Sequence, residues 1–232
     1  MKRYFVVLAV LTVGFSLRQP DQVAGEVAPF SDKSHYRMVR FNRDAPPLYP
    51  WLLKPDSTRA DWLGIKYENK TLHEPINVII GDGFSGSREE AEAKLMRACI
   101  EADYLDRYGH SSDYLAYVDG NFEGQYPKVK KHSFSDKIFI ETNNHGRIFG
   151  PVTYRGKYWF VAAFSREKVH IKPVGHYYVS FNQARDNFAW KLDRGTYYRV
   201  RKFVNLDNVI VNSLAESSGD HDGIAVYLEA VQ

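Results

Sequence analysis

Two segments of this chain have the spacing of capped amphipathic helices, and a long stretch with the pattern of strands separates them. Ser87 stands three residues before Glu90, the spacing of a capping box, so we expect a helix over about 87–105. Ser180 and Gln183 have the same spacing and predict a second helix over about 181–192. The apolar positions that recur every three or four residues are Ala91, Leu95, Ala98, Ala102 and Leu105 in the first helix, and Phe181, Ala184, Phe188 and Leu192 in the second.

The remaining regular segments have the composition of strands. Phe, Trp and Tyr make up 15% of the residues, and aromatic residues favour strands. Arg155-Gly156-Lys157 is typical of a hairpin turn. Strands are expected at 76–80, 114–119, 137–141, 147–154, 158–165, 197–204 and 224–229. Many strands with only two helices indicate an α+β fold built on a mostly antiparallel or mixed sheet.

The N-terminus has the pattern of an export signal. Lys2 and Arg3 precede an uncharged, mostly apolar segment over 4–17. As a helix this segment is about 21 Å long at roughly 1.5 Å per residue, which is shorter than a bilayer core of about 30 Å. We therefore predict a signal peptide over 1–25 that is cleaved after Gly25, with an uncleaved N-terminal anchor as the alternative. The location expected is extracytoplasmic, either periplasmic or secreted.

Two further regions follow the signal. Residues 26–71 are polar and irregular and contain Ala45-Pro46-Pro47-Leu48-Tyr49-Pro50-Trp51, so we expect an extended arm whose aromatic residues contact the domain. Residues 72–232 are expected to form a single α+β domain. The oligomeric state does not follow from the sequence.

Charge and cysteine content exclude several classes of protein. The net charge is +3, and residues 1–25 carry three cations and one acid, so their removal leaves +1. A nearly neutral domain gives no electrostatic basis for binding nucleic acid. Cys99 is the only cysteine, so no intramolecular disulfide can form, and no cysteine follows the apolar segment to accept a lipid. Its position beside Leu95 and Ala102 predicts a buried thiol.

The common cofactor and metal motifs are absent or incomplete. Residues 81–86 (GDGFSG) match G-x-G-x-x-G, but the helix cap at Ser87 leaves the third glycine outside the helix, and we expect a simple strand-to-helix loop. The sequence contains no H-E-x-x-H, C-x-x-C or H-x-H, and no G-x-S-x-G nucleophile elbow. We therefore expect no cofactor and no metal, and no catalytic residue can be assigned. His221 between Asp220 and Asp222 could supply ligands or an acid–base group, although a polar turn before the last strand is the expectation we favour.

Several segments, in a consistent order over about 72–232, resemble a known family. Residues 74–79 (EPINVI) resemble the strand that opens the LssY C-terminal domain, a poorly characterised bacterial domain. Residues 144–149 (NHGRIF), the hairpin at 154–161 and Ser165-Arg166-Glu167 resemble its following segments. His176, Ala184-Arg185-Asp186 and the Gly219-Asp220 and Asp222-Gly223 pairs resemble its later ones. This family is often attached to membrane proteins, so the resemblance implies an extracytoplasmic or membrane-edge setting and no established reaction.

The resemblance and the charged residues together give a set of candidate ligand-binding residues. They are His145, Arg147, His176, Arg185, Asp186, Asp220 and Asp222. His145 and Arg147 alternate along one strand and so share a face, while Arg185 and Asp186 are expected in the exposed middle of the second helix. Arginine and histidine together suit a small phosphate or carboxylate ligand.

Three functions are consistent with this set. The first is a non-catalytic binding module of the cell envelope with an anionic or other envelope ligand. The second is a hydrolase of phosphorylated or lipid-linked envelope substrates, with a histidine as acid–base and an arginine as anion clamp. The third is a purely structural domain in which the same residues form buried networks. We expect His145, Arg147, His176 and Arg185 to approach one another if they form one site.

Overall fold

The computed structural model describes residues 37–40, 45–108, 113–128, 132–171 and 174–232. The expected signal segment at 1–25 lies outside these residues. The helices are α1 (Arg88–Glu101) and α2 (Phe181–Gly195). The strands are β1 (Arg37–Arg40), β2 (Thr71–Leu72), β3 (Val78–Asp82), β4 (Leu105–Tyr108), β5 (Ala116–Val118), β6 (Asn121–Glu123), β7 (Gln125–Tyr126), β8 (His132–Ser135), β9 (Asn143–Tyr154), β10 (Lys157–Ile171), β11 (Val174–Ser180), β12 (Tyr198–Asn205), β13 (Glu216–Ser217) and β14 (Ile224–Ala230).

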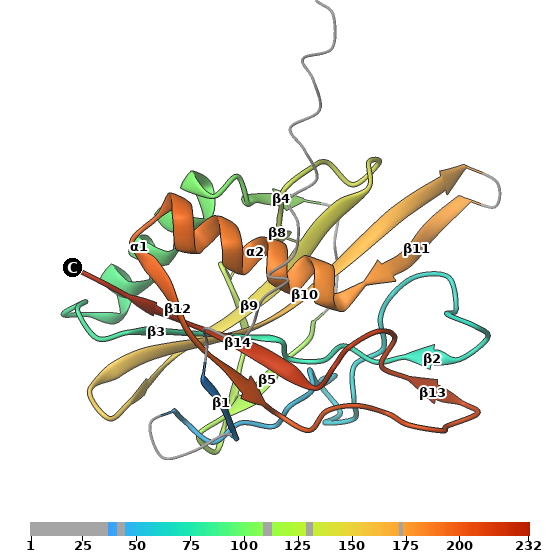
Figure 1. The fold of residues 1–232 in the computed structure, drawn as a ribbon, viewed down its shortest axis with the longest axis horizontal. Helices are drawn as coiled ribbons and strands as arrows, with labels where there is room; N and C mark the ends of the chain where they lie inside the picture. Colours follow the sequence, from blue (N-terminus) through green and yellow to red (C-terminus); the bar gives the residue numbers. More distant parts are fainter. Residues whose placement is uncertain (1–36, 41–44, 109–112, 129–131, 172–173) are drawn as a thin grey trace, which may run out of the picture.

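The expected α+β class is confirmed by a large mixed sheet with two helices. The main sheet has the order β1-β12-β14-β3-β10-β9-β8-β4, and β11 and β7 pair with β10 and β9. The β3–β14 and β1–β12 pairs are parallel, whereas β3–β10, β9–β10 and β12–β14 are antiparallel. Figure 1 shows α1 and α2 on one side of this sheet, and the segment before β3 together with β5 on the other.

Each face of the central strands has its own hydrophobic core. Phe160, Ala162 and Phe164 of β10 face the helices, where Phe164 stacks on Phe188 of α2 with ring centroids 4.0 Å apart. Val161 and Ala163 alternate with them and face the other way, toward the arm, where they pack with Leu52 among others. Because both faces are covered, a polar side chain on a central strand lies inside the protein.

Both helices begin as the sequence predicts. Ser87 Oγ accepts a hydrogen bond from the Glu90 amide at 3.1 Å, and Ser180 Oγ accepts one from the Gln183 amide at 2.9 Å. The first helix is shorter than expected, because the chain reverses at Asp103, which has a positive φ of 62°. Leu105 therefore belongs to β4, where it is exposed, and not to the apolar face of the helix.

The hairpin also follows the sequence, whereas the segment expected to be an irregular arm contains β1, which pairs with β12. Arg155 and Gly156 form a two-residue turn with φ of 50° and 74°, the positive values that this kind of tight turn requires. In the arm, Trp51 and Trp62 are buried against the domain, as expected of its aromatic residues.

One expected strand does not form. Residues 137–141 form bends and a turn, in which the Glu141 amide donates to the Ile138 carbonyl at 3.0 Å. They have strand-like side chains, but none of the described strands pairs with them. Conversely, β11 was not expected, although it pairs along β10 from Arg166 to Ile171. His176 thus lies within a strand.

Within the part of the chain that the structure describes, neither helix combines the length and apolar character needed to cross a membrane.

Cys99 gives a direct test of the core on the helix side. Its side chain is fully buried beside Leu95 and Ala98, and burial raises the pKa of the thiol. We expect a thiol reagent to label the native protein far more slowly than the protein unfolded in urea, because the reactive thiolate is scarce and inaccessible. Equal labelling rates in the two states would contradict this packing.

Candidate functional site

Arg147 lies inside the protein and forms an ion pair with Glu74. Arg147 is opposite Ala163 on β10, so it shares the arm-facing side of the sheet. Its Nη1 lies 3.2 Å from Glu74 Oε1, and its guanidinium lies 5.0 Å from the centre of the Tyr114 ring. Both partners of the ion pair are buried. In the described chain, Arg147 Nε and Glu74 Oε2 have no hydrogen-bond partner, so the pair satisfies only part of its polar surface.

Glu167 joins the two predicted histidines. Its Oε1 lies 2.7 Å from His176 Nδ1 and 3.5 Å from His145 Nδ1. Glu167 and His145 are buried, whereas the His176 side chain is 32% exposed. We call Glu74, His145, Arg147, Glu167 and His176 the sheet cluster. It extends from the interior at Glu74 to the surface at His176.

Three of the five residues of the sheet cluster have side chains whose charge does not depend on an imidazole. They are the two carboxylates of Glu74 and Glu167 and the guanidinium of Arg147. The hydrogen bond that His176 donates to the Glu167 carboxylate raises the pKa of His176, although partial burial opposes this. Burial raises the pKa of Glu74, which the Arg147 charge opposes and the nearby Glu167 charge reinforces. The cluster therefore favours an additional proton.

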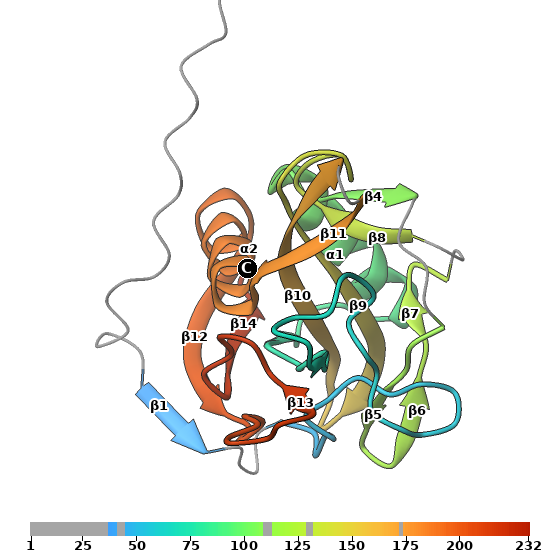
Figure 2. The same cartoon turned by 90° about the vertical axis from the view of Figure 1, so that its right-hand side faces the viewer.

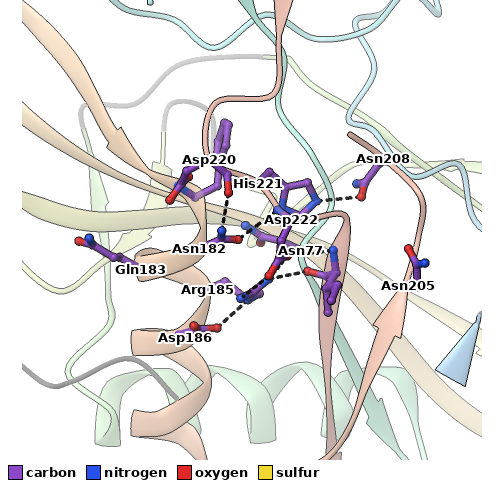
Figure 3. A network of polar contacts seen from close by, with 12 residues as sticks. Asn77, Asn182, Gln183, Arg185, Asp186, Asn205, Asn208, Asp220, His221 and Asp222 are labelled. Atoms are coloured by element: carbon purple, nitrogen blue, oxygen red, sulfur yellow. Dashed lines mark hydrogen bonds and ion pairs between the residues drawn. The ribbon is translucent and has the colours of Figure 1, made fainter. Parts of the chain in front are cut away.

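Arg185 belongs to a different cluster, on the helix side of the sheet (Figure 3). Its Nε donates to Asp186 Oδ1 at 2.7 Å, and its Nη1 donates to Asp222 Oδ1 at 2.6 Å. The same Nη1 donates to the Ile224 carbonyl at 2.8 Å, where β14 begins. We call Arg185, Asp186 and Asp222 the helix cluster. It ties α2 to the start of the last strand.

The expectation that Arg185 and Asp186 are exposed is wrong, since both side chains are buried. Helical periodicity identified the apolar stripe of α2 but not the chain segment that covers its edge. Residues 219–223 fold over this edge and supply Asp222 as a partner. Arg185 has a raised pKa; burial would lower it, but the charges and hydrogen bonds of Asp186 and Asp222 outweigh that effect.

Asp220 and His221 have structural partners. Asp220 accepts hydrogen bonds from the Tyr178 hydroxyl, the Ser180 hydroxyl and the Phe181 amide, so it supports the beginning of α2. His221 is buried, and its Nε2 lies 2.8 Å from Asn208 Oδ1. Asn208 in turn donates to the Pro50 and Ile76 carbonyls. The segment 220–222 is thus the polar turn that we favoured from the sequence.

The structure divides the predicted set between the two faces of the sheet. It brings His145 and His176 together on Glu167, with Arg147 on the same face. Arg185, Asp186 and Asp222 lie with α2, whose core residues pack on the opposite face. Arg147 and Arg185 therefore lie on opposite faces of the sheet, and each pairs with its own acids.

Sequence reasoning missed the acids that organise the sheet cluster. Glu74 and Glu167 both occur in segments used for the family resemblance, but neither was named as a site residue. A period-two reading would have found one of them, because Ser165 lies opposite His145 and Glu167 follows two residues later on the same face. Glu74 precedes its strand, and no local signal places it beside Arg147.

The glycine-rich loop satisfies its own amides. Asp82 accepts hydrogen bonds from the Phe84 and Ser85 amides, and Glu90 accepts one from the Gly86 amide. These carboxylates occupy the donors that a nucleotide phosphate would need. Among the described residues, no group of three or more His, Cys, Asp or Glu side chains is placed to hold a metal ion.

No family model, no curated protein and no solved structure matches this chain.

The raised pKa values of His176 and Glu74 predict a pH-dependent stability. A raised histidine pKa contributes stability below about pH 6.5, the unfolded value, and this is lost as the pH rises through the folded value. The raised pKa of buried Glu74 acts in the same direction, because burial penalises its charged form relative to the unfolded chain; this contribution is lost as the pH rises from about 4.5 through the folded value. We therefore expect the free energy of unfolding in urea to fall as the pH rises above about 6.5.

His176→Gln should reduce this slope, because the substitution removes one titrating group. The matched control is His170→Gln, at an exposed histidine of the neighbouring strand. An unchanged slope in His176→Gln would show that the Glu167–His176 pair does not carry the effect.

Substitution of Arg185 should lower the stability of the fold by a large amount. Arg185→Met should lower the free energy of unfolding by about 3–5 kcal/mol, because it leaves buried Asp186 without its cation. The control is Arg194→Met in the last turn of the same helix, at an exposed position, where a loss of at most about 1 kcal/mol is expected. If both variants lose the same small amount of unfolding free energy in urea, Arg185 does not stabilise the fold through Asp186 and Asp222.

Proposed function

We propose that this chain is an exported, envelope-associated binding module in which the predicted ligand-binding residues stabilise the fold. The observation that carries this proposal is the pairing of both arginines with acids inside the protein. Arg147 lies against Glu74, and Arg185 lies against Asp186 and Asp222. An anionic ligand at either arginine would have to displace a carboxylate that is already desolvated and in contact.

The surface-exposed members of the set also argue against a small anion at this site. They are His176, Asp220 and Asp222. The pKa of His176 is raised, but its charge is balanced by Glu167 at 2.7 Å. The two aspartates would repel phosphate or carboxylate. We therefore place the ligand contact of the module outside the predicted set.

Export and envelope association rest on the N-terminal sequence and on the family resemblance. The basic residues at 2–3 and the apolar segment over 4–17 support passage across a membrane. The similarity of residues 72–232 to the LssY C-terminal domain supports a membrane-edge setting. A purely structural domain would share the same buried pairs but would lack a surface for an envelope component.

A hydrolase is the second candidate, and the Glu167–His176 pair is the observation that favours it. A carboxylate that holds Nδ1 of a partly exposed imidazole is an arrangement used in general acid–base catalysis. This candidate requires hydrolysis of a phosphomonoester or ester that depends on His176 and not on His170. If the protein binds an envelope component but does not hydrolyse these substrates, the binding module is favoured over the hydrolase.

The proposed location has a direct test. Fractionation of the source cells should place the protein in the envelope or outside the cell, because the N-terminal segment directs export. Sequencing of the native N-terminus should give a start downstream of Leu17, with Glu26 as the expected first residue. An intact Met1 on protein from the cytosol would contradict export.

A further inference from the structure

The loop between β8 and β9 exposes three consecutive apolar side chains. Ile138, Phe139 and Ile140 are 43%, 49% and 60% exposed. Apolar residues scattered singly over a surface need no explanation, but a contiguous apolar tip indicates a contact with a partner or a membrane. This segment is the one predicted to be a strand, so its apolar character is not accounted for by burial in a sheet.

Hydrogen bonds at its base hold this loop in a defined shape. Asp136 accepts from the Asn144 amide at 2.8 Å and from Asn144 Nδ2 at 2.6 Å. Asn143 Nδ2 donates to the Glu141 carbonyl at 2.9 Å, and the Glu141 amide closes a turn onto Ile138. The apolar side chains are therefore presented outward by a fixed turn, which lowers the entropy lost on binding.

Basic side chains lie at the same end of the molecule. Asn143 pairs with Glu167, so the loop lies alongside the part of β10 that follows Glu167. That part carries exposed Lys168 and His170, and Lys137 is exposed in the loop itself. Figures 1 and 2 both show the loop and this end of the β10–β11 hairpin on the same side of the molecule. Against the two lysines the loop exposes one acid, Glu141, within residues 136–142.

We propose that residues 137–141 and the 168–170 part of β10 form a docking surface for an anionic lipid membrane. The apolar tip would enter the interface between headgroups and acyl chains, while Lys137 and Lys168 contact the anionic headgroups. A narrow tip of three side chains suits a lipid surface better than a protein, whose stable interfaces bury about 800 Å² per partner. This inference rests on the proposed envelope association and gives that association a chemical partner.

The test uses the full chain and a fluorescent reporter at the tip. Phe139→Trp places an indole in the loop, and Leu214→Trp places one at a 94% exposed apolar position between β12 and β13. Of the four native tryptophans, Trp51, Trp62 and Trp159 are buried and Trp190 on α2 is partly exposed, so the quenching of each variant is measured against that of the unsubstituted protein. The probes are vesicles of phosphatidylcholine and phosphatidylglycerol in equal amounts, with and without brominated acyl chains, which quench an indole on contact.

We expect brominated lipid to quench the indole introduced by Phe139→Trp and to leave that introduced by Leu214→Trp unchanged. Adding Lys168→Glu should weaken the quenching by roughly fivefold in apparent vesicle affinity, because it removes an attraction to anionic lipid. Each comparison keeps the same N-terminus, so a contribution of residues 4–17 to vesicle binding cancels.

Three outcomes would overturn the docking surface. They are no quenching from Phe139→Trp, equal quenching from Leu214→Trp, or self-association through the loop that excludes the vesicle. None of them bears on export, which the N-terminus and the cell fraction decide separately. A cytosolic protein that still docks on vesicles through Phe139 would retain the surface and reject the proposed location.

Discussion

The covering of both faces of the central sheet is the constraint on which the other features depend. The helices bury one side of β10, and the arm with β5 buries the other. A charged side chain on these faces is removed from water and must find a partner within the protein. Arg147 does so with Glu74, and Arg185, on the helix that covers the opposite face, does so with Asp186 and Asp222. The fold thus explains the positions of these polar residues without a ligand.

Local signals in the sequence identified the elements whose causes are local. The caps at Ser87 and Ser180 and the turn at Arg155-Gly156 depend on nearby residues, and all three were found correctly. The strand expected at 137–141 failed because strand formation requires a partner, which composition cannot reveal. The length of β10 and the existence of β11 depend on each other for the same reason.

The candidate site was predictable only in part. Alternation placed His145 and Arg147 on one face, but it did not reveal that α2 covers the other face. Burial of Arg185 follows from residues 219–223, which are distant in sequence from the helix. The approach of Glu74 to Arg147 joins residues 73 positions apart. Such contacts are set by tertiary packing, and no spacing rule encodes them.

The domain thus has a buried polar set and an exposed apolar loop, and we assign them different roles. The pairs of Arg147 with Glu74 and of Arg185 with Asp186 and Asp222 tie the segment before β3, the sheet and α2 to one another. The exposed tip at Ile138, Phe139 and Ile140 is held at its base by hydrogen bonds and lies at the same end of the molecule as Lys137 and Lys168. In this account the charged residues that first suggested a ligand site stabilise the scaffold, and an apolar loop makes the functional contact.

A double-mutant cycle on Glu74 and Arg147 tests the central claim most directly. At neutral pH, Glu74→Gln and Arg147→Met should each lower the free energy of unfolding by about 3–5 kcal/mol, because each leaves a buried partner uncompensated. The double variant should lose little more than one single variant, which gives a coupling energy of about 2 kcal/mol or more. Additivity within about 0.5 kcal/mol would contradict the claim, since it would show that Arg147 is not held by Glu74.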